Sequence, residues 1–192
     1  MKRCLPILVA AAFTPGLFAQ TANPLSSELS QMYTIIKANL LKMARKMPAE
    51  GYGFRPTPQV ETFARRIAHI AGANQRTCAG LKGETKSLDL ASKTAKADLV
   101  AALEQSFAYC DEVFDSLTDR MAVEMVNGRI GSPPSPAPQT RLSIMWNVVR
   151  HSNELYGYMA VYLRLNGVVP PSSGGIEPEA RGMKKDERGS IR

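Results

Sequence analysis

Hydrophobic residues recur every three or four positions in four separate stretches of the chain, which is the pattern of amphipathic helices. The first stretch begins at Asn23-Pro24, where a residue suited to capping precedes a proline suited to the first helical position. Its apolar face consists of Leu25, Leu29, Met32, Ile36, Leu40, Met43 and Met47. Pro48 and Gly51 interrupt the pattern, so we expect the first helix to end there.

The second and third stretches have the same spacing. Thr57-Pro58 repeats the combination of a capping residue and a proline, so we expect the second helix to begin there and to end near Gly80. Its apolar face consists of Val60, Phe63, Ile67, Ile70, Asn74, Cys78 and Leu81, and that of the third helix of Leu99, Leu103, Phe107, Cys110, Phe114 and Leu117. The polar segment from Lys82 to Ala91 connects the two helices.

The fourth stretch follows a loop that is rich in proline from Gly131 to Pro138, and it predicts a helix from Gln139 to Asn166. This helix carries two apolar stripes, so we expect it to be the most buried of the four. Gly167 and Pro170 end it. No stretch alternates convincingly with a period of two. The pattern therefore predicts an all-α four-helix bundle over residues 23–171.

Both ends of the chain differ from this central region. Lys2 and Arg3 precede an apolar stretch from Cys4 to Phe13, which is the layout of a secretory signal peptide over residues 1–19. We expect cleavage after Ala19 or Ala22 and a periplasmic or secreted mature protein. Residues 172–192 combine glycines with mixed charges and few apolar residues, so we expect a disordered tail.

Composition narrows the classes of function. The net charge is +7, but the basic residues are scattered rather than gathered with aromatic residues, which argues against a nucleic-acid partner. No apolar run after residue 20 reaches the roughly 18 residues that a membrane-spanning helix needs, so we expect no stable membrane insertion. A small-molecule ligand and a homodimer both remain open. The chain has only 2 histidines, His69 and His151, which excludes a site of three imidazoles within one chain.

Three segments together resemble the DinB-like superfamily. The first is MPAEGYGFRP from Met47 to Pro56, followed by Phe63 and Ala68-His69-Ile70; the others are HSNELYG from His151 and YLRLNGVVPP from Tyr162. The resemblance extends from Leu25 to Ser173. It implies a four-helix bundle of up-down-down-up topology with a long crossover between helices two and three. It also implies a divalent metal bound by one histidine of the second helix and an H-x-x-x-H pair of the fourth.

The metal ligands of the family carry over only in part. His69 matches the ligand on the second helix and His151 the first histidine of the pair, but Leu155 stands where the second histidine belongs. One hypothesis is a site for zinc, nickel or iron formed by His69, His151 and Glu154, which lies one turn from His151. The other is a decayed site, in which His151 is a buried imidazole and His69 a half-exposed polar residue.

Cys78 and Cys110 lie on the apolar faces of the second and third helices. As free thiols they would be small buried hydrophobic side chains. The parallel orientation of these helices that the resemblance implies brings the two cysteines to similar heights, so a disulfide is the alternative, and an exported protein would permit it.

Three functions follow from these observations. The first is an exported DinB-like bundle with a degenerate site of two histidines, which binds a small molecule or interacts with a partner without robust catalysis. The second is a divalent-metal-dependent hydrolase or thiol transferase that uses His69, His151 and Glu154. The third is a purely structural bundle that forms dimers.

Overall fold

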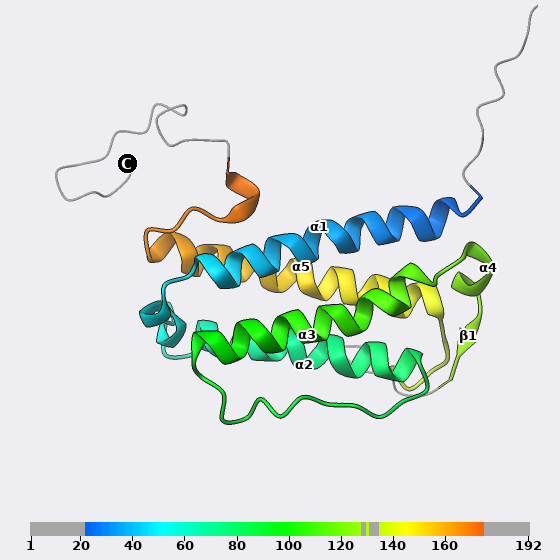
Figure 1. Cartoon of the computed structure of the whole chain (residues 1–192), viewed down its shortest axis with the longest axis horizontal. Helices are drawn as coiled ribbons and strands as arrows, with labels where there is room; N and C mark the ends of the chain where they lie inside the picture. The colour runs from blue at the N-terminus through cyan, green and yellow to red at the C-terminus, as the bar shows by residue number, and fades with distance from the viewer. Residues whose placement is uncertain (1–21, 128–129, 131–134, 175–192) are drawn as a thin grey trace, which may run out of the picture.

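Four long helices form the molecule, which we describe from a computed structural model covering residues 22–127, 130 and 135–174 (Figure 1). They are α1 (Pro24–Lys46), α2 (Phe63–Leu81), α3 (Lys96–Asp115) and α5 (Arg141–Leu165). The predicted all-α helical bundle is confirmed. The predicted signal peptide and residues 175–192 of the predicted tail lie outside the described residues. In the part of the chain that the structure describes, no helix is long and apolar enough to cross a membrane.

The long helices pack in two pairs that run in opposite directions. Figure 1 shows α1 and α5 running one way and α2 and α3 the other. α1 contacts α3 and α5, and α2 contacts the same two helices, which closes the bundle. Because α2 and α3 are parallel, the chain must return along the bundle between them. The crossover segment, residues 82–95, makes this return over the outside of α2 (Figure 1).

Several short elements lie between the long helices or follow the last of them. They are the 3₁₀ helices η1 (Ala49–Gly53) and η2 (Pro171–Ser173), the helix α4 (Asp119–Ala122), and the strands β1 (Met125–Val126) and β2 (Gln139–Thr140). The strands pair antiparallel, Met125 with Thr140 and Val126 with Gln139. The sequence pattern predicted no strand because two residues are too few to show a period of two.

The predicted start of α2 was wrong. Thr57-Pro58 is not helical, and α2 begins at Phe63. Thr62 caps the helix instead, since its hydroxyl oxygen accepts a hydrogen bond from the backbone N–H of Arg65 at 3.3 Å.

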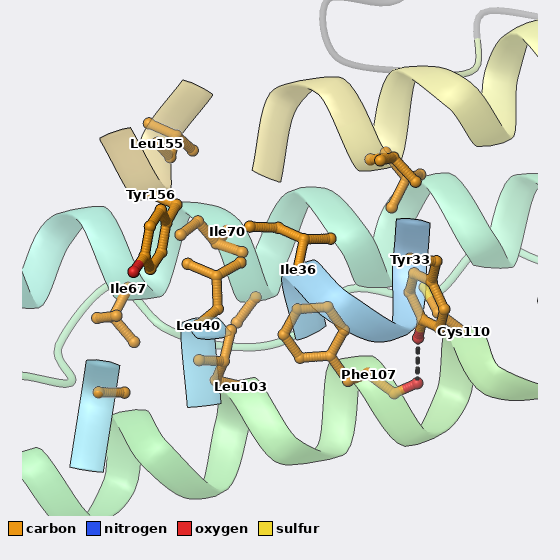
Figure 2. Packing of buried hydrophobic residues seen from close by; sticks show 14 of the residues in the cluster. Tyr33, Ile36, Leu40, Ile67, Ile70, Leu103, Phe107, Cys110, Leu155 and Tyr156 are labelled. Carbon is orange, nitrogen blue, oxygen red and sulfur yellow. Dashed lines mark hydrogen bonds between the residues drawn. The ribbon is translucent and has the colours of Figure 1, made fainter. Parts of the chain in front are cut away.

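The core lies along the centre of the bundle, and most of the apolar positions identified by periodicity are buried. Figure 2 shows side chains of α1, α2, α3 and α5 meeting there. α1 departs from the prediction, because Leu25 and Met32 are exposed and Tyr33 is buried instead. The ring of Tyr33 stacks on Phe114 with centroids 3.8 Å apart, and its hydroxyl lies 3.0 Å from the Phe107 carbonyl oxygen (Figure 2).

α2 rather than α5 is the most buried helix, contrary to the sequence prediction. Fourteen of the 19 residues of α2 are buried, against 10 of the 25 residues of α5. Many of the buried positions of α2 are alanine or glycine, whose small size lets neighbouring elements approach closely. Leu90 of the crossover segment covers one such position, because a Cβ added at Gly72 would lie 3.7 Å from the Leu90 Cδ1.

A disulfide between Cys78 and Cys110 joins α2 to α3, with the two Cα atoms 5.4 Å apart. Both cysteines are fully buried in the core. The bond fixes the relative height of the two parallel helices, close to the point where α2 ends and the crossover segment begins.

A side chain distant in sequence caps α1. The Asp119 carboxylate accepts hydrogen bonds from the backbone N–H groups of Leu25 at 3.2 Å and Ser26 at 2.8 Å, and from the Ser26 hydroxyl at 2.9 Å. Asn23, the predicted cap, makes no capping bond and instead accepts from the Asp119 N–H at 3.0 Å. The first turn of α1 is thus attached to α4.

Candidate functional site

His69 of α2 and His151 of α5 meet at the edge of the interface between these helices. Their Nε2 atoms lie 3.1 Å apart, although 82 positions separate the residues in the sequence. The ring centroids are 5.1 Å apart and the rings are tilted by 54°. His69 is exposed and His151 is half-buried. The fold therefore brings the only two histidines of the chain into one pair, which we call the histidine pair.

Desolvation favours the neutral form of both imidazoles. It lowers the pKa of His151 to about 4, with a further contribution from His69. It is also the main cause of the lowered pKa of His69; Glu61 acts in the opposite direction, and three nearby arginines lower the pKa further. Both rings are therefore neutral at pH 7, and the Nε2–H of one donates to the Nε2 lone pair of the other.

Three arginines surround His69 on α2. Arg65 precedes His69 by one turn, and Arg76 follows it by two turns on the same face of the helix. Together with His69 they line a cavity of about 320 Å³ between α2 and the crossover segment. Arg66 lies to one side, with its guanidinium carbon 5.7 Å from the centre of the Tyr158 ring and its Nε 3.8 Å from Glu61 Oε2.

Neither the hydrophobic periodicity nor a motif in the sequence points to Arg65, Gly72 or Arg76. These residues and His69 follow one another at intervals of four, three and four positions, which places them on one helical face. Because that face is polar, a search for hydrophobic periodicity passes over it. A search for a charged face at helical spacing beside a candidate ligand would have found it.

The position of the histidine that this chain lacks relative to the family, residue 155, is occupied by an apolar side chain. Leu155 is 3% exposed and belongs to the core cluster. Figure 2 shows it with Tyr156 in the cluster that contains Ile67 and Ile70 of α2. The helix therefore uses position 155 for packing.

Glu154, the carboxylate proposed to complete the metal site, has other partners. Its oxygens lie 3.3 Å from Arg150 Nη1 and 3.4 Å from the Tyr158 hydroxyl. Among the described residues, no group of three His, Cys, Asp or Glu side chains is arranged to hold a metal ion. The structure thus brings together His69 and His151, and leaves Glu154 hydrogen-bonded on the surface of α5.

The histidine pair nonetheless has the spacing of two ligands of one ion. Two nitrogen ligands about 2.0–2.1 Å from a tetrahedral zinc ion lie about 3.3 Å from each other. The Nε2–Nε2 distance of 3.1 Å is close to this value. A histidine must also be neutral to bind a metal, and both rings meet this condition. The residues present therefore fit two positions of a divalent ion, and leave the remaining positions to water or to a ligand.

A family model describing the DinB superfamily matches residues 32–159. The chain belongs to the DinB superfamily. The resemblance inferred from its short motifs is thus confirmed, and the matched region of this DinB chain includes His69, His151 and Leu155. A search of curated proteins finds no match.

Solved structures with similar folds support the assignment to the DinB superfamily. A DinB-like protein from Bacillus cereus has a TM-score of 0.62 at 17% identity, with 76% of this chain and 95% of that chain covered. A DinB-like protein from Bacillus subtilis has a TM-score of 0.54 at 13% identity and coverages of 73% and 92%. A conserved protein from Enterococcus faecalis has a TM-score of 0.51 at 14% identity and coverages of 72% and 96%. At these identities the similarity concerns the fold.

Proposed function

We propose that this DinB chain binds a small molecule at a site formed by His69, His151 and one divalent ion of zinc, nickel or iron, without robust catalysis. The observation that carries the proposal is the Nε2–Nε2 distance of 3.1 Å between the two histidines. The lowered pKa of both rings supports it, because a neutral imidazole has one lone pair available for a metal. In the ring that donates through Nε2, the proton moves to Nδ1 when a metal binds.

Two protein ligands leave most of the coordination shell open. We expect a site of this kind to bind a metal more weakly than one with three or four protein ligands. When bound, a divalent ion polarises an oxygen or sulfur atom of a ligand beside it. The role of His69 and His151 is to hold that ion beside the cavity next to α2, which His69 lines.

The catalytic alternative, a hydrolase or thiol transferase, depends on Glu154 as third ligand. For that role the carboxylate must leave Arg150 and Tyr158, to which it is hydrogen-bonded. No observation favours this rearrangement, and the experiment below tests it directly.

The test is calorimetric titration of purified protein without an affinity tag, after removal of metals with a chelator. Zinc, nickel and ferrous iron are titrated separately, the last without oxygen. We expect one equivalent to bind to the wild type, and an affinity at least tenfold lower for His69→Asn and for His151→Asn. Failure of every metal to bind, or unchanged binding by both variants, would contradict the proposal.

Glu154→Gln is the matched control, because it keeps the size and shape of the side chain, removes its charge and replaces one of its two acceptor oxygens by an amide NH2 group. Unchanged metal affinity in this variant supports a site of two histidines. A tenfold loss would instead identify Glu154 as a ligand, and would favour the catalytic alternative.

We also propose that the chain is exported. Lys2, Arg3 and the apolar stretch from Cys4 to Phe13 support this, and a disulfide suits an oxidising compartment. Expression in a bacterial host followed by fractionation tests it. A periplasmic product whose mass corresponds to cleavage after Ala19 or Ala22 is expected, whereas an uncleaved cytoplasmic product would contradict it.

A further inference from the structure

We propose that the cavity between α2 and the crossover segment binds the carboxylate or phosphate group of a small molecule through Arg65 and Arg76. The inference rests on the proposed function, since it names the class of small molecule that the site takes. His69 and both arginines line this cavity of about 320 Å³, so an anion held there lies beside the histidine pair.

The Arg76 guanidinium lies close to the helix backbone at Gly72. A Cβ atom added at Gly72 would lie 3.0 Å from Arg76 Nη1 and 3.9 Å from Arg76 Cζ. The guanidinium therefore lies against the backbone of α2 in the space that Gly72 provides, one turn from His69. The α-helix backbone at Gly72 is ordinary, because the residue does not have a positive φ. The side chains of Arg76 and Leu90 occupy the space that a Cβ atom would need, which explains why residue 72 is a glycine.

Arg65 and Arg76 differ from most other charged residues near the cavity in their ion pairs. Among the ion pairs of the described residues, none involves Arg65 or Arg76. Of the two carboxylates on the cavity wall, that of Glu61 lies 3.8 Å from Arg66, and Asp89 forms none of these pairs. Two guanidinium groups therefore line the cavity, and no carboxylate of the described residues forms an ion pair with either.

The chemistry of guanidinium identifies the ligand class. Its planar fork of N–H donors matches two oxygens of a carboxylate or a phosphate, and such charge-assisted bonds are stronger than bonds between neutral groups. A divalent ion at the histidine pair would stand among three arginines, and an anionic ligand offsets this concentration of positive charge.

The remaining walls limit the size of the ligand. Leu88 and Leu90 of the crossover segment form an apolar outer side, and the volume lies at the small end of the range for ligand pockets. A molecule with a short apolar body and one or two anionic groups meets these conditions.

The experiment is calorimetric titration of the intact purified chain, free of metal, with succinate and inorganic phosphate as probes and neutral succinamide as comparison. We expect at least one of the anions to bind and succinamide not to bind. Arg76→Gln and Arg65→Gln should each weaken binding about tenfold. Arg120→Gln, which removes an exposed charge on α4, should leave it unchanged. The better of the two probes distinguishes a carboxylate ligand from a phosphate ligand.

Two further variants distinguish a specific binding site from nonspecific attraction of anions by a positively charged protein. Gly72→Ala leaves every charge in place but displaces the Arg76 guanidinium, so it should weaken binding. Asp89→Asn removes a negative charge from the wall and should strengthen it. Absence of binding by both anions, or equal affinity in wild type, Arg65→Gln, Arg76→Gln and Gly72→Ala, would overturn the proposal.

The variant with both His69→Asn and His151→Asn distinguishes this inference from the proposed function. It should lose metal binding and keep anion binding in the metal-free state. Metal binding by the wild type without anion binding would refute the arginine site alone. Anion binding without metal binding would refute the metal site alone.

Discussion

The Nε2 of His69 on α2 faces the Nε2 of His151 on α5 at 3.1 Å. Without a metal this contact is a hydrogen bond between two neutral rings, and with a metal the same spacing suits two ligands of one ion. The helices hold the two rings close together, and metal binding would require the donating ring to move its Nε2 proton to Nδ1 and both Nε2 atoms to turn toward the ion. Because Leu155 fills the position of the family's third histidine, that position offers no ligand for a metal.

Acidification should destabilise the wild-type chain more than a His151→Asn variant between about pH 6.5 and pH 4. In the unfolded chain His151 takes up a proton near pH 6.5, whereas in the folded chain its pKa is about 4. The unfolded state therefore binds more protons throughout this window, and the free energy of unfolding falls as the pH falls. Urea unfolding at pH 7, 5.5 and 4.5 measures the difference between the two proteins.

A direct check is an NMR titration of the His151 ring protons. The folded chain should show a midpoint well below 6.5, and His69→Asn should raise it, because one cause of the shift is then removed. A midpoint near 6.5, or parallel stability profiles of wild type and His151→Asn, would show that the histidine pair is more hydrated than the structure indicates.

The long helices could be predicted from the sequence because each carries an apolar face that repeats over many turns. The starts of α1 and α2 could be predicted only in part. The cap of α1 is Asp119, far away in the sequence, and no local pattern around Asn23 reveals it. Thr57-Pro58 has the local features of a helix start, yet Thr62 provides the cap. Local sequence preferences are weak enough for tertiary contacts to override them.

The candidate site could be predicted only where a motif already marked it. His69 and His151 were identified as candidate ligands through the resemblance, and the hypothesis of a decayed site made His69 a half-exposed polar residue. The arginine face around Gly72 was missed because its meaning depends on the crossover segment, which lies over it only in the folded chain. The burial of α2 was underestimated for the same reason.

Asp119→Ala should lower the free energy of unfolding, because the N–H groups of Leu25 and Ser26 lose their acceptor. Partial desolvation raises the pKa of Asp119, but the hydrogen bonds from Ser26 and Leu25 outweigh it and hold the pKa below its ordinary value. Chemical denaturation measures the loss. Asp115→Ala, at the exposed end of α3, is the control and should change stability by less than about 0.5 kcal/mol. Equal effects of the two substitutions would argue against Asp119 as the cap of α1.

Reduction of the bond between Cys78 and Cys110 should lower the free energy of unfolding by about 2–4 kcal/mol, since the bond closes a loop across a sequence separation of 32. Urea unfolding with and without a reductant measures the change, and a variant with both cysteines replaced by alanine should no longer respond to the reductant. Thiol titration of denatured, unreduced protein from a periplasmic preparation should find neither cysteine free. Two free thiols would contradict the disulfide.

Leu155→His should create a site of three imidazoles, because positions 151 and 155 are one turn apart on α5. Leu155 is 3% exposed, so without metal the variant loses apolar packing and buries a polar ring, and its melting temperature should fall. Zinc should restore the melting temperature, because a ligand that binds only the folded state stabilises it. The variant should also bind zinc more tightly than the wild type, since a third nitrogen ligand completes a catalytic type of zinc shell.

Leu155→Gln is the control that separates ligation from polarity. Glutamine is similar in size and polar but is a poor zinc ligand, so it should lower the melting temperature without recovery on addition of zinc. Thermal unfolding of the two variants and the wild type, each with and without zinc, gives the comparison. If Leu155→His recovers no more than Leu155→Gln, a side chain at position 155 does not reach the histidine pair. The ligand set of the family then cannot be rebuilt in this chain by one substitution.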